Sequence, residues 1–189
     1  YANRIQKTIL APESELQKYL ENYFVFFQPK DIVSGDFYWS IEMSRQNNEH
    51  DFYLAVCDST GHGVPGAFMS LLNTNYLNEA IYEKQISEPH LVLNYVRQRL
   101  IESISKEGQK DGFDGILAKI NVQKKKVEYA AANNAPILIR NGKIIEMPTD
   151  KMPVGHGEKP DSFKLNKIDL LAGDRLYFYT DGYADQFGG

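Results

Sequence analysis

The sequence contains a single cysteine, Cys57, and no apolar run long enough to cross a bilayer. One cysteine cannot form an internal disulfide, and the apolar neighbours of Cys57 predict a buried, unreactive thiol. Because a membrane-spanning helix needs about 20 apolar residues, we expect no membrane insertion in this segment. Both features favour a cytoplasmic location. The chain starts at Tyr1 rather than Met, so we expect it to be cut from a longer protein, which could itself be membrane-anchored.

Basic residues are not in excess either. The chain has 21 Lys and Arg against 25 Asp and Glu, which gives a net charge of -4. These charges are mixed along the sequence, so there is no basic stripe to hold a nucleic-acid backbone. The one basic run, Lys124 to Lys126, lies between two strand-like segments and predicts a solvated turn. Nucleic acid is therefore not expected as a partner.

Two familiar catalytic motifs are also missing. The chain has no Gly-x-Ser-x-Gly elbow and no glycine-rich loop of the Gly-x4-Gly-Lys type. The first absence argues against a serine-nucleophile hydrolase. The second argues against a loop that cradles nucleotide phosphates.

The composition is ordinary for one globular domain. The chain has 189 residues, of which 42% are hydrophobic and 24% charged.

Helical spacing predicts two helical pieces within residues 2–20, broken at Ala11-Pro12, and a pair of amphipathic helices with apolar faces over residues 68–81 and 93–104. We expect a hairpin loop at 40–51, a tight hairpin at Asn141-Gly142 and an ordered surface loop at 152–155. Apolar runs predict strands at residues 23–27, 52–57, 116–120, 127–131, 137–140, 143–147, 163–168 and 175–180. Strands in hairpins, followed by paired helices and more strands, predict an α+β fold of antiparallel sheets covered by helices.

Acidic residues recur at the ends of these strands, and the clearest case is Cys57-Asp58-Ser59-Thr60-Gly61-His62-Gly63. An unpaired buried carboxylate is costly, so Asp58 at the end of a core strand calls for a cation or for hydrogen-bond donors. The alternative is that Asp58 caps the following turn and His62 simply packs there. On this stretch alone, both interpretations remain open.

Three further acids share this placement: Asp36 beside Phe37-Tyr38-Trp39, Asp114 before the 116–120 run, and Asp181 before Gly182. Carboxylates brought together would raise one another's pKa unless a cation neutralised them, and all-oxygen ligation suits Mg2+ or Mn2+ rather than Zn2+. Two such ions about 3.5–4 Å apart can activate a shared water and clamp a phosphoryl group during in-line attack. The acids therefore predict a dimetal hydrolase of phosphate esters.

Four motifs in order carry a resemblance to a known family: Gly35-Asp36-Phe37-Tyr38-Trp39, the 57–63 stretch, Met152-Pro153-Val154-Gly155, and Gly173-Asp174 with Tyr179-Thr180-Asp181-Gly182. The loop at 132–136 agrees with the family as well. The sequence resembles the bacterial metal-dependent serine phosphatases. It is most similar to the stage II sporulation protein E-like catalytic domain, found in regulators of sigma-factor partner switching within the type 2C phosphatase superfamily.

The resemblance implies a type 2C phosphatase-like α/β/β/α sandwich with two Mn2+ or Mg2+ ions at one edge. It implies that Asp58 bridges both ions, that Ser59 binds through its backbone carbonyl, and that Asp36 and Asp181 each bind one ion. Asp114 ranks below these as a ligand, for an additional ion. His62 is either the general acid for the leaving alkoxide or a residue that structures its loop, because one extra residue separates it from Asp58.

The resemblance also implies a protein serine/threonine phosphatase acting in bacterial signalling, with phosphoserine or phosphothreonine in a protein as substrate, for example an anti-sigma-factor antagonist-like domain. We expect residues 1–20 to be a helical linker or regulatory segment, joined to an upstream sensor and able to pair with a second copy, and residues 21–189 to be the catalytic domain. The superfamily places one more ligand on a later strand, and Asp185 is too close to Asp181 to supply it, so we expect the domain to be truncated at its C-terminus and to bind one ion weakly. The alternatives are a catalytically weak binding module and a hydrolase of nucleotides or other small phosphate esters.

Overall fold

A computed structural model describes residues 1–44, 50–104, 111–158 and 161–184, and it contains two antiparallel sheets. The larger sheet has the strand order β1-β2-β3-β4-β8, and β7 pairs with the first two residues of β3. The smaller sheet has the order β6-β5-β9. The strands of the larger sheet are β1 (Asp36–Ser44), β2 (His50–Ser59), β3 (Gly112–Asn121), β4 (Lys126–Ala132), β7 (Val154–Gly155) and β8 (Asn166–Asp169), and those of the smaller are β5 (Ile137–Arg140), β6 (Lys143–Glu146) and β9 (Arg175–Tyr177).

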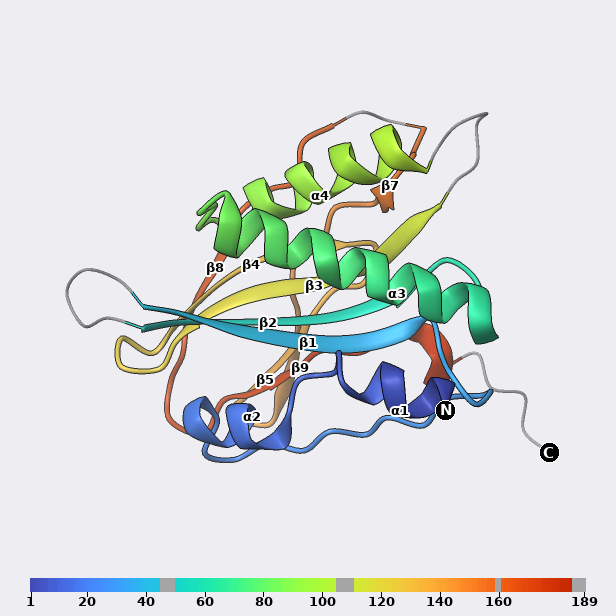
Figure 1. The fold of residues 1–189 in the computed structure, drawn as a ribbon. Coiled ribbons are helices and arrows are strands. Elements are labelled where there is room, and N and C mark those ends of the chain that lie inside the picture. The colour runs from blue at the N-terminus through green and yellow to red at the C-terminus, as the bar shows by residue number, and fades with distance from the viewer. Residues whose placement is uncertain (45–49, 105–110, 159–160, 185–189) are drawn as a thin grey trace.

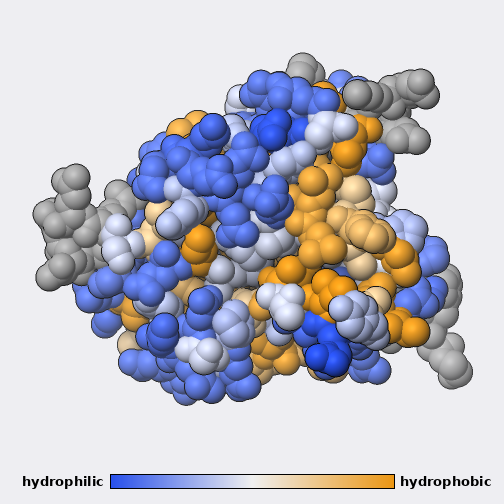
Figure 2. Space-filling view, in the orientation of Figure 1, coloured by the Kyte–Doolittle hydropathy of each residue, from blue (hydrophilic) through white to orange (hydrophobic). Residues whose placement is uncertain are grey.

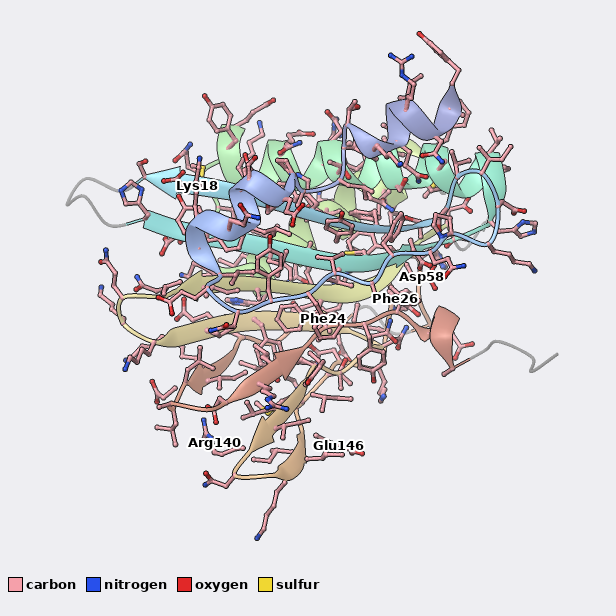
Figure 3. All side chains as sticks on the ribbon, turned by 90° about the horizontal axis from the view of Figure 1, so that it is seen from below. Lys18, Phe24, Phe26, Asp58, Arg140 and Glu146 are labelled. Atoms are coloured by element: carbon pink, nitrogen blue, oxygen red, sulfur yellow. The ribbon has the colours of Figure 1, made fainter. Side chains whose placement is uncertain are left out.

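Helices cover the larger sheet on one face. Helix α3 (Gly63–Asn78) continues into a π-helical turn (Glu79–Glu83), and α4 (Pro89–Ser103) follows it across the same face. On the opposite face lie the smaller sheet and two short helices, α1 (Ala2–Lys7) and α2 (Glu13–Tyr19). Figures 1 and 3 together show that α1 and α2 lie on the same side of the larger sheet as the smaller sheet, with α1 farther from the smaller sheet than α2 is. The predicted α+β fold of antiparallel sheets flanked by helices is confirmed.

Two apolar cores follow from the period-2 alternation of the strands. On β2, Tyr53, Ala55 and Cys57 join the core beneath α3 and α4, whereas Phe52 joins the core between the sheets. Cys57 is buried, as its neighbours predicted. Asp58 follows Cys57 and therefore faces the layer of the smaller sheet, at the very end of the inter-sheet core.

The predicted Asn141-Gly142 hairpin is confirmed between β5 and β6. Both residues have positive φ, +52° for Asn141 and +73° for Gly142. Two consecutive positive φ values are what a type I′ turn requires, and Asn followed by Gly meets that requirement at the least steric cost.

The strand predicted at residues 23–27 is wrong. This segment pairs with no strand in the described part of the chain, and Phe24 and Phe26 are 72% and 71% exposed. It runs beside β9, where Phe24 meets Tyr177 edge to face with ring centroids 6.1 Å apart. Aromatic and β-branched residues favour strands only where a neighbouring strand accepts their hydrogen bonds, and none does so here.

Several predicted boundaries also move. Residues 40–44 and 50–51, predicted as a loop, extend β1 and β2 as a paired ladder, in which Glu42, Ser44 and His50 are exposed and Asp51 is buried. Residues 45–49 lie outside the described part. The strand at 163–168 is found at Asn166–Asp169, and the one at 175–180 ends at Tyr177, with only half-buried apolar residues.

The segment predicted as a surface loop at 152–155 is instead part of the core. Val154 is fully buried, and Val154 and Gly155 pair with Phe113 and Gly112 of β3. A Cβ atom on either glycine would collide with the backbone of the opposite strand. This close backbone approach is possible only because both residues are glycine.

One face carries exposed apolar side chains. Figure 2 shows apolar residues gathered along α3, where Val64 and Phe68 are 56% and 67% exposed. Ile5 on α1 is also 44% exposed. Among the described residues, no helix is long and apolar enough to span a membrane.

Candidate metal centre

Three of the four predicted acids form a row across three neighbouring strands. In the antiparallel register, Asp36 of β1 lies opposite Asp58 of β2, and Asp58 lies opposite Asp114 of β3. Residues directly opposite each other on antiparallel strands project from the same face of the sheet, with Cβ atoms about 4.5–5.5 Å apart. The register therefore places three carboxylates side by side where the inter-sheet core ends. The middle residue of the three, Asp58, is labelled in Figure 3.

The fourth acid, Asp181, arrives from the far end of the chain. It opens a short 3-10 turn (Asp181–Tyr183) that follows β9 after three residues. The next residue, Gly182, lies against the row, since a Cβ atom there would be 3.6 Å from Asp36 Oδ2. The charge of Asp181 raises the pKa of both Asp36 and Asp58. The structure thus brings Asp181 to the row formed by the other three acids.

The proximity of these acids changes their proton affinity. Burial, the charge of Asp36 and a hydrogen bond with Asp181 raise the pKa of Asp58 to about 8. Burial is also the main cause that raises the pKa of Asp36, opposed by hydrogen bonding from Thr180. Burial raises the pKa of Asp114, opposed by a hydrogen bond from Asn133. Three neighbouring carboxyls that resist ionisation form a site that a cation would stabilise.

The donor set suits a hard divalent cation. The row offers carboxylate oxygens alone, which is the ligand type that Mg2+ and Mn2+ prefer. In the part of the chain that the structure describes, no group of three or more Asp, Glu, His or Cys side chains is arranged so that it could hold a metal ion. The acids fit such ions by their chemistry and by their adjacent strand positions, and their side chains would have to move from these positions to bind one.

Close backbone packing holds the loop after Asp58 against the start of β1. The Ser59 amide donates to the Gly35 carbonyl at 3.2 Å. A Cβ atom at Gly35 would lie 2.5 Å from the Gly61 oxygen and 2.7 Å from the Ser59 oxygen. Gly61 itself has φ +92°, which favours glycine. The glycines next to the acids therefore let the strand ends bearing Asp36 and Asp58 meet.

A hollow of about 400 Å³ opens on the Asp114 side of the row, lined by Asp58, Thr60, Asp114, Asn133 and Pro153 among others. Thr60 fixes its rim, since its amide donates to the Gly112 carbonyl at 2.9 Å and its hydroxyl accepts from the Gly112 amide at 3.1 Å. The hollow gives a bound group access to Asp58 and Asp114 from one side.

His62 points to solvent and contacts a residue outside the row of acids. Its side chain is 90% exposed, and its Nδ1 lies 3.4 Å from Asp31 Oδ2 in the preceding loop. This contact ties the 61–63 loop to the segment before β1. The observed geometry therefore agrees with the loop-structuring alternative for His62.

Two residues beside the site carried little signal in the sequence. Asn133 has φ +58° and donates from Nδ2 to Asp114 Oδ1 at 2.8 Å. Thr180 hydrogen-bonds Asp36. The only available hint was their place in the 132–136 and 179–182 motifs, since neither residue type by itself indicates a partner.

Most of the chain matches a known protein family. Residues 48–188 match the family described as stage II sporulation protein E (SpoIIE). The chain is 22% identical over 191 residues to the phosphoserine phosphatase RsbP of Bacillus subtilis (strain 168). That match covers 97% of the chain but only 44% of RsbP, so the chain spans less than half the length of this relative.

Solved structures share the fold. The SiaA-PP2C domain of Pseudomonas aeruginosa superimposes with a TM-score of 0.83 at 27% identity, covering 100% of this chain and 72% of that one. The PP2C phosphatase domain of SpoIIE from Bacillus subtilis, solved with a fragment of its regulatory domain, gives a TM-score of 0.61 at 22% identity, covering 79% and 41%. The antiparallel sheets and the helices over them are therefore those of PP2C phosphatase domains.

Proposed function

Since the chain belongs to the stage II sporulation protein E (SpoIIE) family, we propose that it is a divalent-metal-dependent protein serine/threonine phosphatase of bacterial signalling. The observation that carries the proposal is the row of Asp36, Asp58 and Asp114 across β1, β2 and β3, with Asp181 against it. Such a set of adjacent, partly buried carboxyls has no role in packing and is costly without cations.

The position of each acid suggests its role. Asp58 lies in the middle of the row, between Asp36 and Asp114, which supports the proposal that it would contact two ions. Asp36 and Asp181 would each bind one of these ions. The Ser59 carbonyl, packed against Gly35, is the proposed neutral ligand. When bound, Mn2+ or Mg2+ would lower the pKa of a water and polarise the phosphoryl oxygens.

Asp114 and His62 have lesser proposed roles. Asp114 lies on the outer side of Asp58, facing the hollow with Asn133, and is proposed to hold an additional ion. His62 is exposed and contacts Asp31, so it would reach a leaving alkoxide only after its loop moves.

The proposed substrate is a phosphoserine or phosphothreonine ester in a protein, such as an anti-sigma-factor antagonist-like domain in a partner-switching system. The relative RsbP is itself named a phosphoserine phosphatase. The hollow beside Asp58 is open, as a site that receives a residue of a folded protein needs to be.

Residues 1–20 are proposed to link the catalytic domain to an upstream sensor and to pair with a second copy. Support comes from the exposed apolar side chains Ile5 on α1 and Val64 and Phe68 on α3. Figure 2 shows that apolar surface gathers on one face of the molecule. Exposed apolar patches of this kind commonly mark protein contacts.

Hydrolysis assays with three substrates test the proposed function. A phosphoserine peptide, p-nitrophenyl phosphate and nucleotides would each be offered with Mn2+, with Mg2+ and with EDTA. We expect metal-dependent release of phosphate from the peptide. Faster turnover of nucleotides would favour the small-ester hydrolase, and peptide binding without turnover would favour the binding module. Full activity in EDTA would contradict the metal-dependent reaction.

A further inference from the structure

Helix α1 buries a polar residue and exposes an apolar one. Gln6 is 5% exposed, whereas its neighbour Ile5 is 44% exposed. A helix that only needed to pack would bury Ile5, because transfer of an apolar side chain from water is favourable and transfer of an amide is not. The orientation of α1 therefore has to be explained by what the Gln6 amide contacts.

The Gln6 amide satisfies both backbone groups of one residue, Ser34. Its Nε2 donates to the Ser34 carbonyl at 2.5 Å, and its Oε1 accepts from the Ser34 amide at 3.0 Å. Nε2 also lies 3.4 Å from the hydroxyl of Ser70 on α3, which is fully buried. Across the described part of the chain, the backbone of Ser34 makes no hydrogen bond to another backbone group. Gln6 thus takes the place that a neighbouring strand would otherwise fill.

Ser34 in turn holds the first acid of the row. Its hydroxyl accepts a hydrogen bond from the Asp36 amide at 3.0 Å, at the residue where β1 begins. Between them, Gly35 packs against the carbonyls of Ser59 and Gly61. A shift of the Ser34 turn would therefore move Asp36 relative to Asp58. The three residues Gln6, Ser34 and Asp36 form a continuous hydrogen-bonded path from α1 to the candidate metal centre.

We infer that Gln6 is a positioning residue for Asp36, acting through the Ser34 turn, so that the affinity of the site for its metal depends on the docking of α1. This inference rests on the proposed function, because it requires Asp36 to bind a metal. Gln6 touches neither metal nor substrate. It fixes a turn whose polar groups are buried and whose loss of partners would be costly.

The test measures Mn2+ affinity by calorimetry, without any activity assay. Gln6→Met keeps the length and bulk of the side chain but removes its donor and acceptor. The matched control is Gln17→Met on α2, where the exposed glutamine amide donates to Glu13 Oε1 at 3.5 Å. Ser34→Ala removes the hydroxyl that accepts from the Asp36 amide and hydrogen-bonds the Asp36 carboxyl, and it leaves the Gln6 contacts with the Ser34 backbone in place. Asp36→Asn shows how much affinity the site loses with its ligand.

We expect Gln6→Met and Ser34→Ala each to weaken Mn2+ binding about tenfold, the equivalent of roughly one hydrogen bond, with Gln17→Met unchanged. Because both act on one turn, the double variant should lose less than the sum of the two effects. Thermal unfolding in EDTA provides the comparison with a merely structural role. Gln6→Met with a lowered Tm but wild-type Mn2+ affinity would overturn the inference.

Ser34→Ala decides the matter if Gln6→Met does not fold, since wild-type Mn2+ affinity in that variant would equally overturn the inference. Failure of the proposed function gives a different result. In that case the wild-type chain would bind no Mn2+, or Asp36→Asn would bind it as well as wild type does.

Discussion

Asp36 and Asp58 lie directly opposite each other on the antiparallel strands β1 and β2, at the last pair before the strands separate. Neither side chain can ionise without opposing the other, and Asp114 stands next to Asp58 on the other side. Antiparallel sheets normally avoid like charges at directly opposite positions. This exception is the reason that we propose a metal centre at this edge of the sheet.

Asp58→Asn should therefore remove most of the function. Asp58 has a carboxylate opposite it on both neighbouring strands, so we expect its loss to weaken Mn2+ binding and activity by at least about 100-fold. Asp114→Asn, at the end of the row, should cost less than about tenfold in both. Calorimetry and phosphate release measure these effects, and equal losses in the two variants would contradict the central role of Asp58.

The metal-free protein should become less stable as the pH rises from about 4 to about 8. The pKa of Asp58 is about 8 in the folded protein, against an ordinary value of 3.8. Between these values the folded state retains a proton that the unfolded state has released, so raising the pH favours unfolding. The raised pKa of Asp36 and Asp114 acts in the same direction. Thermal unfolding in EDTA at several pH values measures this trend.

Asp58→Asn is the control for this pH dependence, because it removes the carboxyl whose pKa is raised to about 8 and should flatten the curve. Mn2+ should reverse the trend in the wild-type protein, since metal binding displaces the proton and grows stronger up to about pH 8. Metal-free protein that gains stability between pH 5 and pH 8 would show that the acids are not held as described.

Gly35→Ala should damage the site without touching an acid. Its Cβ would lie 2.5 Å from the Gly61 oxygen and must push the 59–61 loop away from β1. We expect a loss of about 1–3 kcal/mol in unfolding free energy and weaker Mn2+ binding. Gly142→Ala is the control, because it meets no atom within 4 Å and bears only the strain of φ +73°. A Gly35→Ala protein that binds Mn2+ like wild type would mean that the contact relaxes harmlessly.

Asn133→Gly tests the hydrogen bond to Asp114 without straining the backbone. Glycine accepts the observed φ of +58°, so the turn should persist. Because the Asn133 amide opposes the rise in the pKa of Asp114, its removal should raise that pKa further. Carboxyl NMR titration of the metal-free protein measures this change. An unaltered titration of Asp114 would contradict the assigned role of Asn133.

Ile5→Ser tests the proposed pairing of α1. Ile5 is largely exposed, so the change should leave the fold intact, whereas it should weaken self-association if α1 meets a second copy. Light scattering over a range of concentrations measures the association state. Lys7→Ser on the same helix is the control for a change at an exposed position. The same association state in wild type and Ile5→Ser would remove α1 from the interface.

Local sequence determined the parts of this protein that depend on near neighbours in the chain. Alternation of apolar residues predicted most strands, Asn141-Gly142 predicted its hairpin, and the glycines beside Asp36 and Asp58 marked strand ends where backbones approach closely. These signals succeed because backbone preference and side-chain periodicity act over a few residues.

The tertiary structure alone decided which segments meet. The register that sets Asp114 opposite Asp58, the arrival of Asp181 from the end of the chain, the burial of Val154 and the inward turn of Gln6 all depend on contacts between distant segments. The unpaired segment at 23–27 shows the same limit, since strand-forming residues become a strand only beside a partner. The local sequence determines which side chain stands at a strand end. A site needs several strand ends close together, and the packing of distant segments determines that arrangement.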